Sequence, residues 1–395
     1  MPSPPIYLDN NATTRPDPRV IEAMLPFFSE HYGNAASRAH AFGWAAEEAV
    51  ATARRQVAAL VNADPREIVW TSGATESNNL ALKGIAEKLS DKGRHLVTVE
   101  TEHKAVLDAA KHLEQSGWEV TYLPVDRQGL VSLDDLRNSL TDGTVLVSVM
   151  MGNNEIGTLQ PVGEIGAICR ERGILFHTDA TQCVGHVPVD VQALPIDLMS
   201  LTAHKMHGPK GVGALYVRRR SPRVRLTAQM DGGGHELGMR SGTLNVPGIV
   251  GFGKACEICQ NELPEEQPYL TRLRDRLIEG VCDSVPGVSL NGHPTERLPH
   301  NVSLSFEGVE GDALLTSLPD VALSTGSACS SESLAPSYVL KALGLSDAQA
   351  YATLRFGVSR FTTDAEIDYI VGRLAEATAR LRKLSAPRTL AAAGR

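Results

Sequence analysis

Over residues 43–201, short apolar stretches alternate regularly with longer amphipathic ones. Short stretches rich in Val, Ile and Leu favour strands, whereas apolar residues that recur every three or four positions favour helices. Strands that alternate with helices imply right-handed crossovers, so the pattern predicts an α/β fold with a mostly parallel sheet flanked by helices. The expected strands are 68–70, 95–99, 118–125, 145–150, 174–177 and 198–201. The expected helices are 43–61, 74–89, 103–115, 133–140 and 163–172.

The pattern changes after residue 250. The acidic stretch 262–267 carries Pro264 and suggests a domain boundary. Beyond it we expect helices at 269–284, 311–318, 337–343 and 364–384, and strands at 288–290, 301–306 and 352–358. This is an α+β pattern, which predicts a smaller second domain. We therefore expect a large domain of residues 15–260, a small domain of residues 1–14 and 261–384, and a loose tail at 385–395.

The composition argues against several classes of protein. The formal net charge of −8 does not suit a general nucleic-acid binder, which usually has a basic face. No apolar run approaches the roughly 18 residues of a membrane-spanning helix, and residues 1–9 do not resemble a signal peptide, so we expect a cytoplasmic protein. Six cysteines in 395 residues do not form a disulfide scaffold. The spacing of Cys256 and Cys259 suits one face of a helix better than zinc or redox chemistry, and we expect no metal site.

Polar residues follow five of the expected strands, at the point where each strand ends. In open α/β sheets, ligands bind beyond the carboxyl ends of the strands. We therefore expect these five groups to converge on one site. The groups are Ala74-Thr75, Glu102-His103, residues 153–155, residues 179–182 and His204-Lys205.

Lys205 is the residue of this set with the most distinctive chemistry. It follows the apolar run 198–201, and Gly208, Pro209 and Gly211 then impose a loop. A partly desolvated amine loses its proton more readily and can attack a carbonyl to form a Schiff base. Taken alone, a lysine in a Gly-Pro turn is more often an ordinary surface residue, so its interpretation depends on its neighbours.

Several neighbouring groups have the chemistry of a pyridoxal phosphate (PLP) site. Residues 71–77 form a helix start whose free N–H groups favour a phosphate, although an ordinary capping turn has the same composition. Asp179 can hold a proton on a heteroaromatic nitrogen, or it can bond the backbone as a structural carboxylate. A lysine, an aspartate and a phosphate-suited helix start are the parts that PLP needs.

The remaining polar residues of the five groups allow two interpretations each. His103 can stack on a ring or move protons, but a histidine at a helix start is also often solvated or a cap. Gln182 and Asn154 can hydrogen-bond a phenolic oxygen, or they can be satisfied amides of the interior.

Cys329 and Arg355 suit substrate chemistry. Cys329 lies in residues 323–336, which are rich in small hydroxyl side chains, so we expect a mobile, exposed thiol that can be a nucleophile or an incidental loop cysteine. Arg355 lies in a strand-like run and requires a partner, either a substrate carboxylate or an internal salt bridge. The glycine-rich residues 231–243 form a loop without an assigned role. We expect the other cysteines to be packing residues: Cys169, Cys183, Cys256, Cys259 and Cys282.

From residue 7 to about residue 384, the chain resembles the cysteine desulfurases, which are PLP enzymes of the aspartate-aminotransferase-like fold (fold type I). The most specific motifs are residues 71–78, 101–104, 153–157, 179–182, 204–205 and 326–329. The long stretch around Cys329 and residues 336–340 resemble the subgroup with a mobile cysteine loop, which feeds iron–sulfur cluster assembly and other sulfur pathways.

The resemblance implies roles for the cofactor-binding residues. Lys205 carries the covalent link to PLP and abstracts the substrate α-proton. Asp179 pairs with the pyridinium nitrogen, and His103 stacks on the ring as a further catalytic residue. Gln182 and Asn154 bond around the ring oxygen. The implied phosphate-binding set is Ala74, Thr75, Thr202, His204 and, across a homodimer interface, Thr243 of the partner subunit.

The resemblance also implies the reaction. Arg355 binds the carboxylate of L-cysteine, and Asn154 and Asn34 belong to the same substrate-binding set. Cys329 attacks the substrate sulfur, giving alanine and an enzyme persulfide that passes sulfur to acceptor proteins such as an iron–sulfur scaffold.

The chain departs from the family pattern in three places. Thr202-Ala203 replaces Ser-Gly, Asn34-Ala35 replaces Asn-Pro near the substrate entrance, and the tail after residue 384 lacks the aromatic residues of housekeeping members, which puts scaffold docking there in doubt. A selenocysteine lyase and an aminotransferase of the same fold are the alternative enzymes. A sulfur-carrying scaffold without catalysis is disfavoured because Lys205 and Asp179 are both present.

Overall fold

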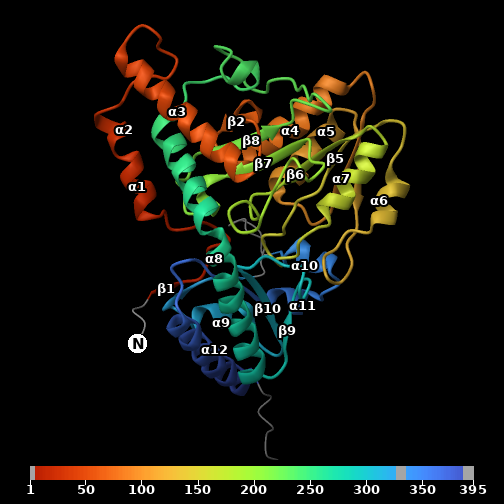
Figure 1. Cartoon of the computed structure of the whole chain (residues 1–395). Helices are drawn as coiled ribbons and strands as arrows, with labels where there is room; N and C mark the ends of the chain where they lie inside the picture. Colours follow the sequence, from red (N-terminus) through yellow and green to blue (C-terminus); the bar gives the residue numbers. More distant parts are fainter. Residues whose placement is uncertain (1–4, 326–334, 386–395) are drawn as a thin grey trace, which may run out of the picture.

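The part of the chain that the structure describes, residues 5–325 and 335–385 of a computed structural model, is built on a seven-stranded sheet (Figure 1). The strands are β2 (Ile68–Thr71), β3 (His95–Val99), β4 (Glu119–Leu123), β5 (Thr144–Ser148), β6 (Leu175–Asp179), β7 (Leu198–Thr202) and β8 (Gly213–Val217). Their spatial order is β2-β8-β7-β6-β5-β3-β4. Strands β3 to β7 run parallel, whereas β8 is antiparallel to both of its neighbours, so β2 points the same way as β7. The predicted mostly parallel sheet is confirmed.

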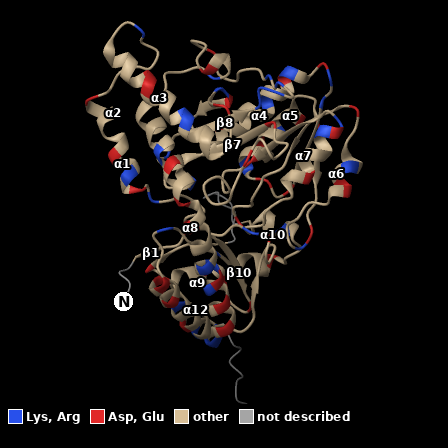
Figure 2. Cartoon of the chain, in the orientation of Figure 1, with Lys and Arg blue, Asp and Glu red and all other residues tan. Residues whose placement is uncertain are grey.

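Helices cover both faces of this sheet because alternate residues of each strand point to opposite sides. In β3, Val97 and Val99 pack in one core with α3, α7 and α8, whereas Leu96 packs in another with α4 and α5. Most of the lysine, arginine, aspartate and glutamate residues lie on the helices and loops around the sheet (Figure 2). The helices of this part are α1 (Pro18–Met24), α2 (Pro26–Ser29), α3 (Ala41–Leu60), α4 (Ala74–Leu89), α5 (Lys104–Gln115), α6 (Leu133–Ser139), α7 (Val162–Glu171) and α8 (Val246–Ser284).

Helix α8 differs from the expectation. The acidic stretch with Pro264 is itself helical, because α8 has 39 residues and continues through Pro264 and Pro268. A proline inside a helix removes one backbone hydrogen bond, but both halves of α8 are fixed by packing. Ile258 belongs to the core of the large sheet, and Leu270 belongs to a separate core. The predicted start of this helix at residue 269 is therefore wrong, and the division into domains at residues 260–261 stays a prediction.

The second core contains a smaller antiparallel sheet in the order β12-β13-β10-β9. Its strands are β9 (Val288–Leu290), β10 (Asn301–Phe306), β12 (Ser324–Thr325) and β13 (Thr353–Gly357). Strand β1 (Ile6–Tyr7) pairs in parallel with β11 (Val321–Ala322), so the start of the chain packs here with Ile6 and Leu8. The helices of this part are α9 (Gly311–Thr316), α10 (Tyr338–Ala342), α11 (Asp347–Tyr351) and α12 (Asp364–Ser385).

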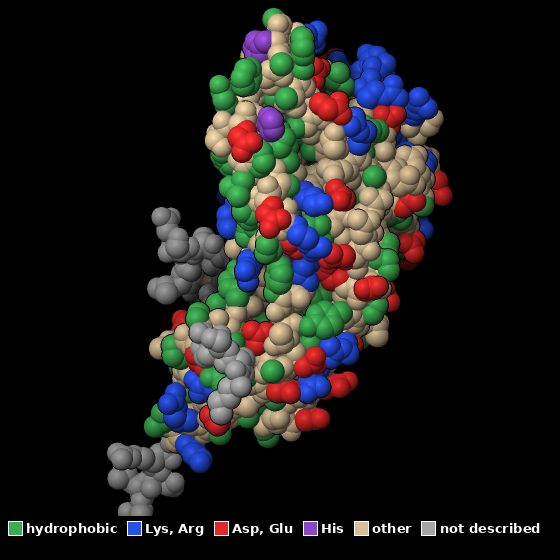
Figure 3. Space-filling view, turned by 60° about the vertical axis from the view of Figure 1, so that its left-hand side comes forward, with side chains coloured by type: hydrophobic (Ala, Val, Ile, Leu, Met, Phe, Trp, Pro, Cys, Tyr) green, Lys and Arg blue, Asp and Glu red, His purple; other side chains and the backbone are tan. Residues whose placement is uncertain are grey.

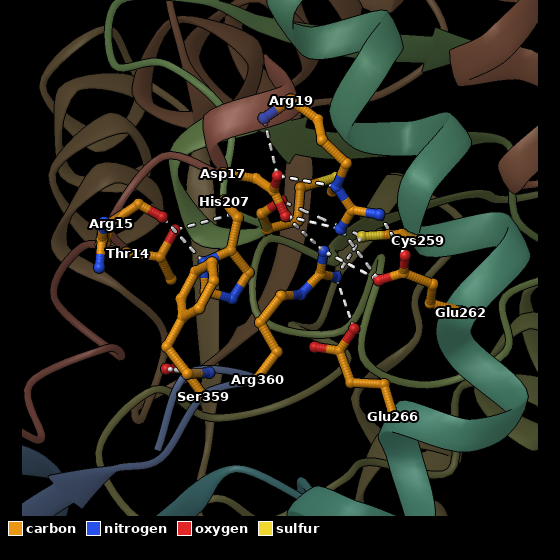
Figure 4. Close-up of polar contacts among 12 residues, drawn as sticks. Thr14, Arg15, Asp17, Arg19, His207, Cys259, Glu262, Glu266, Ser359 and Arg360 are labelled. Carbon is orange, nitrogen blue, oxygen red and sulfur yellow. Dashed lines mark hydrogen bonds and ion pairs between the residues drawn. The ribbon is translucent and has the colours of Figure 1, made fainter. Parts of the chain in front are cut away.

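Five charged side chains join the two cores at the middle of α8 (Figure 4). We call Asp17, Arg19, Glu262, Glu266 and Arg360 the junction cluster. Arg360, which follows β13, contacts Asp17 at 3.3 Å, Glu262 at 3.4 Å and Glu266 at 2.5 Å. Arg19 contacts Asp17 at 2.8 Å and Glu262 at 2.5 Å. The cluster links the N-terminal segment, α8 and the segment that follows β13.

Candidate active site

The five groups of polar residues meet at one edge of the large sheet, because β2, β3, β5, β6 and β7 all end there. At least one residue of each group lines a cavity of about 560 Å³, which we call the strand-end cavity. Its lining includes these ten residues of the sequence prediction: Ala74, Thr75, His103, Asn154, Asp179, Gln182, Thr202, His204, Lys205 and Arg355. Its lining also includes residues that the prediction did not assign: Asn11, Ala12, Thr13, Ser72, Gly73, Glu76, Met150, Gly152, Thr181, Lys210 and Gly211.

Lys205 ends a 3-10 turn, Ala203–Lys205, that directly follows β7. Its Nζ donates to the carbonyl oxygen of Ala12 at 2.7 Å and to that of Asn11 at 2.5 Å. The N-terminal segment therefore lies against the lysine amine at the cavity wall. Beside it, burial together with the charges of Lys205 and Lys210 lowers the pKa of His204 to about 4, so His204 is neutral at physiological pH.

Asp179 is the last residue of β6 and is 5% exposed. Its Oδ2 accepts from Asn78 Nδ2 at 2.7 Å, and its Oδ1 accepts from the backbone N–H of Thr181 at 3.0 Å. Both donors are neutral, and within residues 5–325 and 335–385 no lysine or arginine forms an ion pair with this carboxylate. A buried carboxylate favours a cationic partner. The strand-end cavity is open to a ligand that supplies one.

Glu102 is a second carboxyl group near Asp179. It is completely buried, and Met150 donates its backbone N–H to Glu102 Oε1. Burial and then the nearby Asp179 charge raise the pKa of Glu102 well above its ordinary value. Glu102 therefore favours its protonated, neutral form.

The start of α4 is shaped for an anion. Gly73 is its N-cap and makes no side-chain cap, so its first backbone N–H groups face the cavity edge with the positive end of the helix dipole. Gly213 on β8 packs against this turn, and a Cβ there would lie 2.7 Å from the Cα of Gly73. Glycine at position 213 thus allows β8 to approach the turn that carries Ala74 and Thr75.

His103 is both a helix cap and a cavity residue. Its Nδ1 accepts from the backbone N–H of Ala105 at 3.1 Å, which confirms the capping alternative. The ring lines the strand-end cavity, and burial among the surrounding protein atoms lowers its pKa. The His103 ring, which caps α5 through Nδ1, presents its remaining edge and its face to a ligand.

Arg355 has an internal partner and also lines the strand-end cavity. It lies on β13, is 5% exposed and forms an internal ion pair with Asp9 at 3.2 Å. Its Nη1 also donates to the carbonyl oxygen of Asn154 at 3.2 Å, and its Nη2 to Ser324 Oγ at 3.2 Å. The salt-bridge alternative is therefore confirmed, and the same guanidinium lines the strand-end cavity, where it can meet a carboxylate.

Two predicted site residues, Asn34 and Thr243, are not part of the strand-end cavity. Cys329 lies outside the described residues. Thr243 is exposed on the surface. Asn34 lines a second cavity of about 600 Å³, which it shares with Arg54 and His235, so a single chain does not bring it to the predicted site.

The cysteines match the expectation except at one position. Cys169, Cys183, Cys256 and Cys259 are buried, as expected for packing residues. Cys282 is exposed, because it lies on the outer face of α8, so its assignment to packing is wrong. In the described part of the chain, no group of three His, Cys, Asp or Glu residues could hold a metal ion. No helix in the same part is long and apolar enough to span a membrane.

The residues of the strand-end cavity fit PLP. The unpaired Asp179 matches a protonated ring nitrogen, Lys205 supplies the amine, and the first turn of α4 can accept a phosphate. The observation that decides the fit is the buried Asp179 carboxylate, since a neutral ligand would leave it without a cation.

Comparison with known proteins agrees with this chemistry. The aminotransferase class-V family model matches residues 6–370. The cysteine desulfurase IscS of Methylococcus capsulatus is 56% identical over 381 residues, covering 96% of this chain and 94% of the relative. Human cysteine desulfurase is 52% identical, with 96% and 83% covered.

Solved structures agree as well. A NifS-like protein superposes with a TM-score of 0.89 at 39% identity, covering 95% of this chain and 100% of the other. SspA in complex with cysteine gives a TM-score of 0.81 at 37% identity, with 91% and 100% covered. The chain therefore belongs to the aminotransferase class-V family and, within it, to the cysteine desulfurases, which are PLP-dependent enzymes.

Proposed function

We propose that this enzyme takes the sulfur of L-cysteine through the strand-end cavity, releasing L-alanine and leaving a persulfide on Cys329. The observation that carries the proposal is the buried Asp179 carboxylate, which lies without a cationic partner among the described residues and faces the same cavity as Lys205 and Arg355. A solved relative, SspA in complex with cysteine, supports this substrate.

The cofactor supplies the chemistry of electron withdrawal, and the side chains bind and orient the cofactor. When bound, PLP supplies an electron sink for negative charge that develops on the substrate. Asp179 would hold a proton at the ring nitrogen and so keep that nitrogen cationic. His103 would stack on the ring, and Gln182 and Asn154 would bond its oxygen. The phosphate would lie against Ala74, Thr75, Thr202 and His204.

Lys205 has two tasks in this proposal. Its amine would attach the cofactor covalently and then move the substrate α-proton. The carbonyl oxygens of Asn11 and Ala12 accept from Nζ, so they hold the amine at the cavity wall when it is protonated. A lysine amine must be neutral to accept a proton.

Substrate binding falls to Arg355. Asp9, Ser324 and the Asn154 carbonyl oxygen hold the Arg355 guanidinium in place. Its N–H donors are therefore positioned before a substrate carboxylate binds. Fixing the fork before binding lowers the entropy lost when the substrate is oriented.

The sulfur step conserves atoms and electrons. The Cys329 thiolate attacks the substrate sulfur, the Cβ–S bond breaks, and the carbon takes up protons to give alanine. The enzyme keeps the sulfur as Cys329–S–SH. An acceptor thiol, such as one on an iron–sulfur scaffold protein, would then remove it, and we place this exchange in the cytoplasm.

We further propose a homodimer with shared sites. Asn34 and Thr243 do not reach the strand-end cavity of their own chain, which supports their acting at the partner's site. Six large apolar side chains on and between α1, α2 and α3 are 40–66% exposed: Ile21, Leu25, Phe28, Tyr32, Phe42 and Trp44. Figure 3 shows apolar side chains gathered along this side of the molecule. Such a patch suits burial against a second copy, and sedimentation that finds a stable, fully active monomer would oppose it.

The proposed reaction is tested by incubating the pure protein with L-cysteine and measuring alanine and sulfide together. In the presence of a thiol reductant, we expect equal amounts of the two products. Cys329→Ser should keep the bound chromophore, carry no persulfide by mass spectrometry and form no alanine. Undiminished alanine formation by this variant would contradict the mechanism. A requirement for a keto acid would instead indicate an aminotransferase.

A further inference from the structure

Two buried histidines contact two of the residues that line the strand-end cavity. The rings of His186 and His300 are stacked, with centroids 4.0 Å apart and an interplanar angle of 31°. His186 Nε2 lies 2.9 Å from the carbonyl oxygen of Lys205, and His300 Nε2 lies 3.3 Å from Gln182 Oε1. His186 is 3% exposed and His300 is 1% exposed. The pair therefore contacts both the segment that follows β6 and the segment that follows β7.

The partners determine which ring nitrogens carry hydrogen. A carbonyl oxygen can only accept, so His186 must donate from Nε2 to Lys205. Gln182 Nε2 donates to the carbonyl oxygen of Asn11 at 2.9 Å, which fixes the amide with its oxygen toward His300. His300 must therefore also donate from Nε2.

The other ring nitrogen of each histidine, Nδ1, is buried and has no hydrogen-bond partner among the described residues. A hydrogen there would be left unsatisfied in the interior, which is costly. Burial lowers the pKa of both rings and outweighs the nearby Glu266 carboxylate, which raises the pKa of His186. The charged and titratable groups around the pair are Lys205, His207, Glu266, Arg274 and Arg360. Both rings are thus neutral, with hydrogen on Nε2.

This arrangement fixes what Gln182 presents to a ligand. One of its two amide N–H groups is used by Asn11, and its oxygen is occupied by His300. The second N–H group remains for the cavity that Gln182 lines. If the amide were reversed, its oxygen would face the Asn11 carbonyl oxygen, and two acceptors would repel each other.

We propose that His300, stacked on His186, is a positioning residue that holds Gln182 as an N–H donor toward the ring oxygen of the cofactor. An N–H donor stabilises the ionised form of that oxygen, whereas an amide oxygen would destabilise it. The inference rests on the proposed cofactor role of Gln182. It concerns the protonation of the cofactor and its affinity, so it does not depend on which reaction follows.

The test uses His300→Leu, which keeps an apolar volume and removes the donor, and His300→Gln, whose amide nitrogen can replace Nε2. Two readouts need no turnover: the pH titration of the bound cofactor's absorbance and the dissociation constant of PLP from titrated apoprotein. We expect His300→Leu to raise the apparent pKa of the chromophore and to weaken PLP binding about tenfold, the size of one buried hydrogen bond. His300→Gln should stay within about threefold of the wild type.

A double-mutant comparison separates positioning from packing. In a Gln182→Leu background, the added His300→Leu change should have little further effect on either readout. An equal effect in both backgrounds, or no effect of His300→Leu in the wild-type background, would overturn the proposal. If His300→Leu does not fold, nitrogen-15 spectra of histidine-labelled wild-type protein decide. We expect hydrogen on Nε2 of His300, and hydrogen on Nδ1 would contradict the proposal.

Discussion

The strand-end cavity and the junction cluster both contain partly or fully buried charged groups, but they differ in whether a buried carboxylate has a cationic partner. In the junction cluster each charged group has an opposite partner within 3.4 Å, and Arg360 alone contacts three carboxylates. In the cavity, Asp179 is bonded only by neutral donors among the described residues. Paired charge holds the chain together, whereas a carboxylate left without a cation in a cavity is available to a ligand.

The pKa values agree with this difference. The hydrogen bonds from Arg19 lower the pKa of Asp17 far below its ordinary range. Near Asp179, by contrast, burial lowers the pKa of His103 and His204 and raises that of Glu102, so these three groups are neutral.

The largest effect should come from Asp179→Asn. The amide keeps the shape but removes the charge that would hold a proton on the cofactor, so we expect turnover to fall by about 10³-fold with little change in melting temperature. Asp197→Asn is a matched control, because Asp197 is equally buried but lies near Arg218 at 3.5 Å. It should lower stability and retain turnover once folded. Equal losses of activity in the two variants would contradict the distinction between paired and unpaired carboxylates.

Arg360→Leu should act on stability instead of chemistry. It would leave Asp17 and Glu266 buried without Arg360, and breaking a buried pair costs about 3–5 kcal/mol. We expect urea unfolding to report a loss of about 3 kcal/mol, with turnover of the folded enzyme within about threefold of wild type. Arg276→Leu removes an exposed pair with Asp368 and should cost less than about 1 kcal/mol. Equal costs for the two variants would mean that the junction cluster has no special role.

Arg355 belongs to both kinds of region, since it has an internal partner and also lines the cavity. Arg355→Gln should raise the KM for cysteine by about 30-fold, because a neutral amide replaces a charged fork at the substrate carboxylate. The effect on kcat should be smaller. Steady-state kinetics over a range of cysteine concentrations measure both, and an unchanged KM would assign Arg355 to the Asp9 pair alone.

The smallest effect concerns pH. Burial lowers the pKa of His177 to about 4, and burial together with Arg360 lowers that of His207 to about 3. Unfolded histidine titrates near 6.5, so below that pH the unfolded chain binds protons that the folded chain does not. The free energy of unfolding should therefore fall as pH drops from about 6.5 to about 5, by up to about 1.4 kcal/mol per pH unit for each histidine. His177→Asn should reduce this slope in urea titrations, and a flat wild-type profile would contradict the assignment.

The sequence predicted most of the central sheet, because its strands are short apolar runs that alternate with amphipathic helices. Strand β8 was missed, because it begins with Gly213 and Ala214 directly after a Gly-Pro loop and resembles a continuation of that loop. The continuity of α8 was also missed. Its two prolines are strong local signals for a break, whereas the packing of its two halves in separate cores is a tertiary effect.

The position of the candidate site could be predicted because strand direction brings the residues after β2, β3, β5, β6 and β7 to one edge. The sequence did not show that Asp9 pairs with Arg355, 346 positions away, or that His300 contacts Gln182. Such contacts depend on how the second core meets the first. Lys210 could have been noticed, because it lies five positions after Lys205 in the same glycine-rich loop.

Lys205 is the amine that we propose holds the cofactor. PLP-loaded protein can be reduced with borohydride, digested and analysed by mass spectrometry to locate the pyridoxyl group. We expect it on Lys205, and we expect Lys205→Ala protein to carry none and to lose nearly all turnover. Lys210 lines the same cavity and is the natural competitor. A pyridoxyl group on Lys210, or no reducible chromophore in the wild-type protein, would contradict the assignment of Lys205.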